Sequence, residues 1–318
     1  MQLVQIHKPT EKQKIQKQCT NLIMGTAQLY PDKLEHACEM LDAYLDAGGN
    51  TLDTAHQYEG SEEVVGKWLE KSKKRDQIQL LTKGAHPDDG EPGNRVKRDS
   101  IKKDLFESLD RLKTDYVDFY ALHRDDHEVE VGPIMEALNE HIEAGRIHTI
   151  GVSNWTYERI QEANEYALAN GLIGFTFSSP NLSLAKCNEP RWPGCISLDQ
   201  KGIDWYAEKQ MPVFSWSSQA GGFFSGRFSP EDRSNEEMVR VYYSQENWER
   251  FQRASVLAEE KKVTPIQIAL AYVVNQSFPT AAIIGPETKE ELLSSVEATN
   301  IVLSKHEMDW VDLLRDSR

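Results

Sequence analysis

The chain carries short runs of apolar residues at regular intervals, with longer segments of helical periodicity between them. Each run has the length and the β-branched or aromatic content of a buried strand. The runs are NLIMG (21–25), NTLDT (50–54), IQLLTK (78–83), YVDFYALH (116–123), HTIGVS (148–153), IGFTFS (173–178), PVFSWS (212–217) and AAIIG (281–285). Strands that alternate with helices in this way predict a parallel sheet.

The intervening segments have apolar positions three and four residues apart, which is the spacing of one face of a helix. They predict helices over residues 34–48, 62–77, 95–113, 132–146 and 267–276. Glycines close the first and the fourth of these segments, and Pro265 stands just before the last. Glycine after a helix and proline in its first turn are typical boundary signals, so these helices are well delimited.

Eight predicted strands are the number that closes a (β/α)8 TIM barrel, and 318 residues are enough to build one. A doubly wound open sheet is the alternative architecture. It would usually carry a G-x-G-x-x-G turn after its first strand, whereas the corresponding segment here reads MGTAQLY. We therefore predict the α/β class, with one barrel domain over residues 1–318.

Two connections are too long for simple loops. Residues 179–199 follow the sixth predicted strand, and residues 218–247 follow the seventh. Long connections in compact domains are usually lids or binding loops. Both leave the carboxyl ends of strands, which is the face of a barrel that carries the active site.

Charge and composition exclude several classes of function. The net charge is −15 and there is no block of basic residues, so neither nucleic acid nor an anionic membrane is an expected partner. The four cysteines are scattered without metal-ligand spacing, so no metal site is expected. No apolar run is long enough to span a membrane. The first eighteen residues lack the apolar segment of a signal peptide, and we expect a cytoplasmic protein.

Polar side chains stand at the carboxyl ends of consecutive predicted strands. Asp53, Lys83 and His123 end the second, third and fourth strands, and Tyr58 follows the second. In a closed barrel these ends meet at one mouth. His56 and His86 lie near Asp53 and Lys83 in the sequence, and we expect them to lie behind the catalytic residues or at the surface.

These four residue types suit proton transfer to or from a carbonyl oxygen. An isolated tyrosine has a pKa of about 10, and a neighbouring lysine cation favours the phenolate and lowers that pKa. An aspartate would fix the charge and position of the lysine. A histidine beside the tyrosine can orient a carbonyl oxygen or relay its proton. Hydride transfer to the carbon would require a cofactor.

The ordered motifs DTAHQY, TKGAH, LHRDD, GVSNW and FSWSSQAGGFFSGRF resemble those of the aldo-keto reductase superfamily. The resemblance extends from MGTAQLY to IIGPETKEELLSSVEA, which is nearly the whole chain. It implies that Tyr58 is the general acid/base, that Lys83 and Asp53 adjust its pKa, and that His123 lines the oxyanion site. It also implies a nicotinamide cofactor that is bound without a Rossmann domain.

The cofactor contacts implied by this resemblance lie at the same strand ends. Ser153 and Asn154 would bond to the carboxamide, and Trp216 would stack on the nicotinamide. The full implied set is Gly25, Thr26, Ser153, Asn154, Ser178, Trp216, Ser217, Gln219, Ala220, Gly221, Arg227, Gly285, Glu287, Glu291 and Ser295. The family commonly has a glutamine at the end of the sixth strand. Here Ser178 or Ser179 takes that place, with the register left open.

The segment expected at the adenosine end reads GPETKEELLSS and departs from members that prefer NADPH. Those members often carry arginine or lysine there to bind the 2′-phosphate. Glu287 and Glu291 would repel that phosphate, whereas a carboxylate can accept bonds from a ribose 2′-hydroxyl. Lys289 is the one cation that could compensate. The cofactor is therefore NAD(H) or NADP(H), and the sequence favours NAD(H).

Other roles remain open at this point. Arg124, Asp125 and Asp126 could reach the substrate or form a solvated loop, and Trp155 and Trp192 could line the pocket. The substrate class expected is a small carbonyl or alcohol, such as a sugar or polyol. One alternative is a cofactor-holding regulatory subunit similar to potassium-channel β-subunits. Another is a phosphate-handling lyase on a barrel, which would leave Tyr58 and Lys83 without a role.

Overall fold

The computed structural model of the chain describes residues 1–6, 18–87 and 95–317. Much of the segment in which no signal peptide is expected lies outside the described residues. The barrel strands are β3 (Leu22–Gly25), β4 (Thr51–Asp53), β5 (Gln79–Gly84), β6 (Val117–Leu122), β7 (Ile147–Ser153), β8 (Phe177–Ser179), β9 (Val213–Ser215) and β10 (Thr280–Ile284). They pair in parallel in the closed order β10-β3-β4-β5-β6-β7-β8-β9. The predicted (β/α)8 barrel is confirmed.

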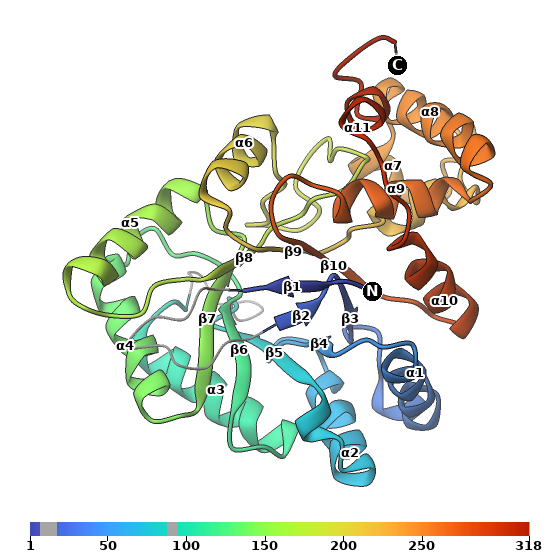
Figure 1. Cartoon of the computed structure of the whole chain (residues 1–318). Helices are drawn as coiled ribbons and strands as arrows, with labels where there is room; N and C mark the ends of the chain where they lie inside the picture. The colour runs from blue at the N-terminus through green and yellow to red at the C-terminus, as the bar shows by residue number, and fades with distance from the viewer. Residues whose placement is uncertain (7–17, 88–94, 318) are drawn as a thin grey trace.

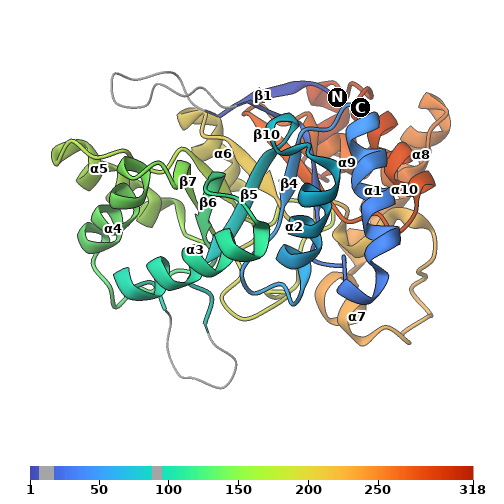
Figure 2. The ribbon, with the colours of Figure 1, turned by 90° about the horizontal axis from the view of Figure 1, so that it is seen from below.

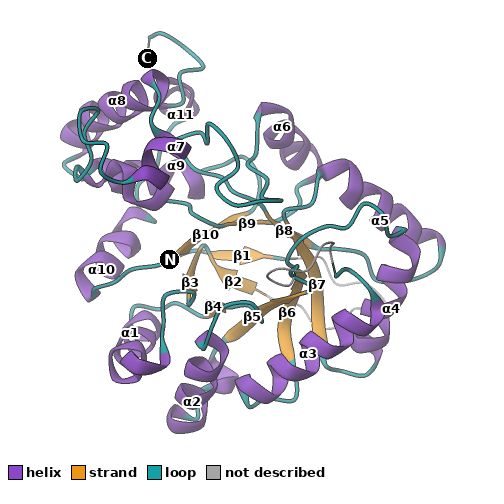
Figure 3. Cartoon of the chain, turned by 180° about the vertical axis from the view of Figure 1, so that it is seen from behind, coloured by secondary structure: helices purple, strands orange, loops and turns teal. Residues whose placement is uncertain are grey.

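Helices surround the barrel as an outer ring, which Figures 1 and 3 show from opposite sides. They are α1 (Leu34–Asp46), α2 (Ser61–Ser72), α3 (Arg98–Leu112), α4 (Val131–Glu143), α5 (Tyr157–Ala169), α6 (Gln200–Lys209), α7 (Glu236–Tyr242), α8 (Gln245–Lys261), α9 (Pro265–Val274), α10 (Lys289–Ala298) and α11 (Lys305–Val311). Short 3-10 turns are η1 (Pro31–Lys33), η2 (Arg75–Gln77) and η3 (Ala220–Ser225). None of the helices in the described part of the chain is long and apolar enough to cross a membrane.

The interior of the barrel is filled by three phenylalanine rings at one level. Phe177 stacks on Phe214 with ring centroids 4.8 Å apart, and Phe119 meets both rings edge-on. Successive side chains of a strand point to opposite faces, so every second residue from these positions also points inward. The outward residues pack against the helix ring in a separate and larger core.

An antiparallel hairpin closes the amino-terminal end of the barrel. Its strands are β1 (Leu3–Gln5) and β2 (Gln18–Thr20), and Val4, Ile6 and Cys19 join the interior cluster. Figure 2 shows β1 along one end of the barrel and α7 at the opposite end. Apolar contacts from this hairpin exclude water from the bottom of the barrel, which leaves the carboxyl end as the open mouth.

The two long connections differ in structure. Residues 179–199 form an irregular loop between β8 and α6, tied to the barrel by a bridge from Asn181 to Trp216. Residues 218–247 contain η3, α7 and the start of α8, so much of this segment is helical. Both begin at the carboxyl end of the barrel, where the predicted site residues gather.

Candidate active site

Three of the four predicted catalytic side chains, those of Asp53, Lys83 and His123, continue the inward-facing rows of the barrel strands, and Tyr58 lies in the loop after β4. Lys83 lies two residues beyond Leu81, and His123 lies two residues beyond Ala121, and both Leu81 and Ala121 belong to the interior cluster. Asp53 ends β4 beside Leu81 in the sheet register. Because alternate residues share a face, these polar side chains form the top layer of the barrel interior.

Asp53, Lys83 and Tyr58 form one connected group. The Lys83 Nζ lies 2.5 Å from Asp53 Oδ1 and donates to the Tyr58 hydroxyl at 3.4 Å. It also donates to the Thr54 carbonyl at 3.0 Å. The Asp53 and Lys83 side chains are only 4% and 3% exposed. The structure therefore brings together three residues that the sequence placed at the ends of two neighbouring strands.

Burial and charge act against each other on these groups. Burial lowers the pKa of Lys83. The Asp53 carboxylate and the Tyr58 hydroxyl together raise it by more than burial lowers it, so the pKa lies above its ordinary value. The ammonium is thus charged at neutral pH. Burial raises the pKa of Tyr58, and the Lys83 cation only partly opposes this shift. The sequence predicted that Lys83 would lower the pKa of Tyr58. Lys83 does act in that direction, but burial outweighs it and the pKa of Tyr58 is raised.

His123 is buried beside the tyrosine. Its ring lies 5.6 Å from the Tyr58 ring and 4.8 Å from the His86 ring, measured between centroids. Burial, followed by the charges of Lys83 and Arg124, holds its pKa well below the ordinary value. The imidazole is therefore neutral at neutral pH. Its buried Nδ1 has no hydrogen-bond partner among the described residues.

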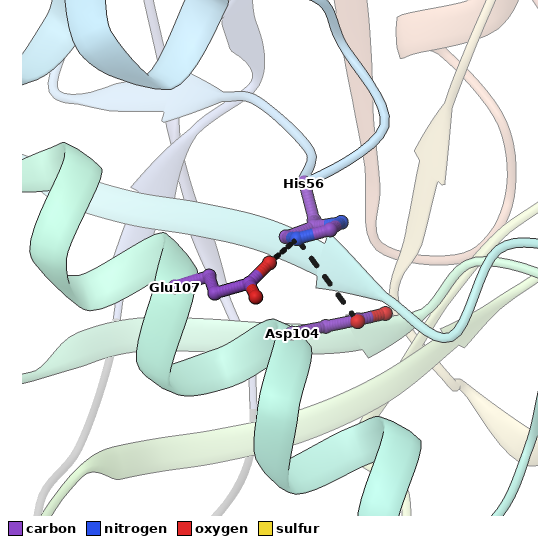
Figure 4. A group of neighbouring side chains, drawn as sticks. All are labelled: His56, Asp104 and Glu107. Atoms are coloured by element: carbon purple, nitrogen blue, oxygen red, sulfur yellow. Dashed lines mark hydrogen bonds and ion pairs between the residues drawn. The ribbon is translucent and has the colours of Figure 1, made fainter.

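A second cluster behind the mouth links the catalytic loop to α3 (Figure 4). His56 Nε2 lies 2.7 Å from Glu107 Oε2 and 4.0 Å from Asp104 Oδ1. Asp104 Oδ2 accepts from the amide of Ala85 at 2.8 Å, and Arg95 bonds to both Asp104 oxygens. The side chains of His56, Asp104 and Glu107 place their ligand atoms within 4.8 Å of one another, an arrangement that could hold a metal ion.

The contacts within that cluster are better explained by a network of ion pairs than by a metal site. The bidentate contact from Arg95 occupies the carboxylate that a cation would need, and Arg111 lies 3.6 Å from Glu107. The network positions two segments of the mouth. The amide of His56 bonds to the Lys83 carbonyl at 2.8 Å, and Ala85 holds a left-handed φ of 59° just beyond β5.

Ser153, Asn154 and Trp216 form a polar shelf at the far side of the mouth. Ser153 Oγ donates to the Ser179 carbonyl at 2.8 Å, and Asn154 Nδ2 donates to Ser153 Oγ at 3.0 Å. Trp216 Nε1 donates to Asn154 Oδ1 at 3.2 Å. Asn154 has a left-handed φ of 61°, which turns its amide group into this network. The shelf holds the Trp216 ring in one orientation at the edge of the mouth.

The end of β8 settles which serine faces the barrel interior. Phe177 points inward, so Ser178 points outward and Ser179 points inward again. Ser178 is fully buried on the side of the strand that faces the helix ring. Of the two serines that the sequence left open for this place, Ser179 is therefore the one that faces the barrel interior, and Ser178, which stands in the implied set of cofactor contacts, faces the helix ring.

Four residues with left-handed backbone conformation lie in the turn after β9. Ser217, Ala220, Gly221 and Gly222 have φ values of 47°, 50°, 61° and 84°. Such turns direct backbone N–H groups into a concave anion-binding arrangement. Arg227 Nη2 donates to the Gly221 carbonyl at 3.0 Å, and a Cβ on Gly222 would stand 2.3 Å from Arg227. Gln219 lies in the same turn, and a set of backbone donors with one guanidinium is of the kind that could hold a phosphate group.

The remaining predicted cofactor residues lie on β3 and after β10. A Cβ on Gly25 would stand 2.9 Å from the Ile284 carbonyl, so only glycine fits there. The hydroxyl of Thr26 donates to the Asp53 carbonyl at 3.0 Å and also contacts Ser61, so this side chain supports Asp53. Gly285 is exposed at the end of the last strand.

Helix α10 begins in the predicted adenosine segment. Glu291 Oε2 accepts from the amide of Glu287 at 2.8 Å, and Ser295 Oγ donates to the Glu291 carbonyl at 2.9 Å. Lys289 lies 3.8 Å from Glu39, so its charge is shared with a carboxylate of α1. The carboxylates of Glu287 and Glu291 are exposed at the start of the helix.

The loop after β8 contributes Arg191, which sequence reasoning missed, and Trp192, which the sequence analysis named as a candidate pocket residue. Arg191 Nη1 donates to Ser217 Oγ at 2.8 Å, and Arg191 also pairs with Glu237 of α7 at 3.0 Å. The Trp192 ring is 46% exposed and lies 5.7 Å from the Trp216 ring, measured between centroids. The unusual length of this connection was the one signal for these contacts. Trp155 is fully buried against Phe175 and does not line the mouth.

Comparison with known proteins agrees with this arrangement. The sequence profile of the Aldo/keto reductase family matches residues 21–316. A norsolorinic acid reductase of Aspergillus flavus is 29% identical over 86% of this chain and 70% of its own length. An aryl-alcohol dehydrogenase of Pestalotiopsis microspora is 26% identical over 87% of this chain and 72% of its own. An uncharacterized oxidoreductase of Bacillus subtilis is 26% identical over 90% of this chain and 89% of its own.

Proposed function

This chain belongs to the aldo/keto reductase family, and we propose that it interconverts a carbonyl compound and an alcohol with a nicotinamide cofactor. The observation that carries this proposal is the contact of the Tyr58 hydroxyl with a buried, charged lysine. A phenol in that setting can give up and regain a proton at a defined place. The oxidoreductase names of the relatives support the reaction class.

In this proposal Tyr58 donates the proton that the carbonyl oxygen gains on reduction and accepts it on oxidation. Lys83 stabilises the phenolate that remains, and Asp53 keeps the ammonium charged and in place. Neutral His123 offers the substrate oxygen a hydrogen bond without adding a charge. The bound nicotinamide supplies or accepts the hydride at the carbonyl carbon.

The polar shelf and the turn after β9 are the proposed cofactor contacts. Ser153 and Asn154 present hydroxyl and amide groups for a carboxamide, and Trp216 presents a ring face beside them. The turn that follows supplies backbone donors, and Arg227 supplies a positive charge. These donors are suited to a phosphate-bearing nucleotide. Ser179 takes the place proposed earlier for Ser178.

The pH dependence should differ between the two directions. Burial holds the Tyr58 pKa above its usual value of about 10, so the phenol stays protonated through neutral pH. The kcat/KM for reduction should therefore be constant from about pH 6 to about pH 10 and fall only above that range. Oxidation should rise with pH, because it needs the phenolate. Profiles of kcat/KM in both directions measure this, and a reduction rate that falls near neutral pH would exclude Tyr58 as the donor.

We further propose a preference for NAD(H). The exposed carboxylates of Glu287 and Glu291 would repel a 2′-phosphate, and Lys289 already lies beside Glu39. Replacing Glu291 with lysine should shift the NADPH-to-NADH affinity ratio about fivefold toward NADPH, the effect of one exposed ion pair. Titrations that follow tryptophan fluorescence measure both affinities. Glu290→Lys adds the same charge one residue away and serves as the control.

The result that contradicts this preference is tighter binding of NADPH than of NADH by the unaltered protein. Equal shifts in Glu290→Lys and Glu291→Lys would attribute the change to overall charge and would exclude a local contact at Glu291. Either result would leave the reaction class standing, since both cofactors deliver the same hydride.

The proposed substrate is a small carbonyl or alcohol compound with a ring that can stack. The exposed Trp192 ring and the Trp216 ring bound one side of the mouth, and indole faces stack on sugars and on aromatic groups. The names of two relatives, an aryl-alcohol dehydrogenase and a norsolorinic acid reductase, favour an aromatic carbonyl over a sugar. Carbonyl-dependent oxidation of NAD(P)H with a panel of aryl and sugar aldehydes tests the proposal.

A regulatory role on the same scaffold is the remaining alternative. It predicts that the cofactor stays bound and that no aldehyde of the panel is turned over. Repeated turnover by the purified chain would exclude it.

A further inference from the structure

A buried arginine lies beside His123 at the rim of the mouth. Arg124 is 8% exposed and directly follows His123 in the chain. Its Nη1 donates to the His123 carbonyl at 2.8 Å, and its Nε donates to the Pro193 carbonyl at 3.2 Å. A Cβ on Gly194 would stand 3.3 Å from Arg124 Cδ. The guanidinium therefore lies between the end of β6 and the loop that follows β8.

The charge of Arg124 has no carboxylate partner within residues 1–6, 18–87 and 95–317. A guanidinium has five N–H donors, and the two bonds to backbone carbonyls leave three without an acceptor among these residues. Removing a cation from water is costly unless an anion compensates it. Among the described residues, Arg124 thus has both the charge and the unoccupied donors to bind an anion.

The other buried arginine of this region forms ion pairs with two carboxylates. Arg159 lies 3.0 Å from Glu162 and 3.5 Å from Asp125. Asp125, the residue next to Arg124, is therefore turned toward Arg159. The side chain of Asp126 accepts from the amide of Glu128 at 3.1 Å. The acidic residues that follow Arg124 in the sequence do not neutralise it.

The charge of Arg124 reaches the groups that would contact the reacting carbonyl. After burial and Lys83, it is the next cause of the low pKa of His123. It is also one of the charges that oppose the rise in the pKa of Tyr58, which burial dominates. A molecule that contacts Tyr58 and His123 therefore lies within the field of this cation.

We propose that Arg124 binds an anionic group on the substrate, and that the substrate is a carbonyl or hydroxy compound that also carries a carboxylate. This inference rests on the proposed oxidoreductase function and adds a substrate class to it. The planar fork of arginine binds a carboxylate through two parallel hydrogen bonds. Because the whole chain has a net charge of −15, a local cation is needed to admit an anionic substrate to the mouth.

The test compares carboxybenzaldehydes with their methyl esters, which differ in charge but share the reacting aldehyde. The 2-, 3- and 4-isomers place the carboxylate at three distances from the carbonyl. For at least one isomer, kcat/KM of the acid should exceed that of the ester by about 10- to 100-fold, the range of one charge-assisted hydrogen-bonded pair. Replacing Arg124 with methionine should reduce this ratio to about one, because the acid loses its charged partner in addition to any change in turnover that it shares with the ester.

Two further variants separate binding of the anion from support of the loop. Arg124→Lys keeps the charge without the fork and should retain part of the preference. Arg159→Met removes a buried arginine that is already paired with Asp125 and disturbs the same loop. It should lower acid and ester turnover by equal factors and leave their ratio unchanged. If Arg124→Met does not fold, the wild-type ratios and the Arg124→Lys variant still decide the question.

The outcomes distinguish this inference from the proposed function. If the esters are reduced but no acid is preferred by the unaltered protein, the inference about Arg124 is wrong and the oxidoreductase function stands. A ratio that survives in Arg124→Met also overturns the inference. If neither acids nor esters nor any other carbonyl compound are reduced, the proposed function itself fails.

Discussion

Replacing Tyr58 with phenylalanine should lower kcat by about a thousandfold, within the range of 10²–10⁴ typical of a positioned general acid. The variant removes one oxygen, the atom that lies 3.4 Å from the Lys83 Nζ. Cofactor affinity should change by less than about twofold, because the proposed nucleotide contacts lie on other strand ends. Steady-state kinetics with an aryl aldehyde and a fluorescence titration with the cofactor measure the two quantities.

Tyr116 provides the control for this substitution. It precedes β6 at the end of the strand opposite to His123, so Tyr116→Phe removes a hydroxyl far from the mouth. Its kcat should match that of the unaltered protein. A Tyr58→Phe variant that keeps more than about a tenth of the activity would assign proton transfer to another group, such as His123.

Replacing Lys83 with methionine should damage both stability and turnover. The substitution leaves the Asp53 carboxylate buried and without its partner at 2.5 Å. Breaking a buried ion pair on one side costs about 3–5 kcal/mol of unfolding free energy. Loss of the cation also removes the charge that favours the Tyr58 phenolate, so kcat should fall by at least about a hundredfold. Denaturant unfolding and steady-state kinetics measure the two effects.

A double variant separates these two consequences. Asp53→Leu combined with Lys83→Met removes both charges and should recover most of the stability, because a buried ion pair can be replaced by apolar groups at little cost. It should recover none of the activity. Recovery of turnover together with stability would show that the pair acts only through folding, which would contradict its proposed influence on Tyr58.

The barrel was predictable because its signal is repeated eight times along the chain. Each strand is buried on both faces and reads as an apolar run, and each is separated from the next by a periodic segment. The predicted run 173–178 was the least accurate, since β8 covers only Phe177–Ser179. That offset led to Ser178 in place of Ser179. A shift of one residue in a strand exchanges the inner and outer faces, and only the position of Phe177 fixes the choice.

Other features depend on contacts between distant segments. The amino-terminal hairpin has strands of three residues each, too short for periodicity to reveal. The contact of His56 with Glu107 joins residues 51 positions apart. The pKa of Tyr58 is raised because the folded chain buries its hydroxyl. The sequence identified the neighbouring residues but not the extent of this burial.

The most direct test of the central claim is transfer of a label from the cofactor to the product. The purified chain is mixed with 4,4-dideuterated NADH or NADPH and the aldehyde panel, and the alcohols are analysed by mass spectrometry. The account predicts one deuterium on the carbinol carbon of a product, formed with consumption of an equal amount of cofactor, and near-complete loss of this product in Tyr58→Phe. Unlabelled alcohol, or no consumption of either cofactor with any carbonyl compound, would contradict hydride transfer at this site.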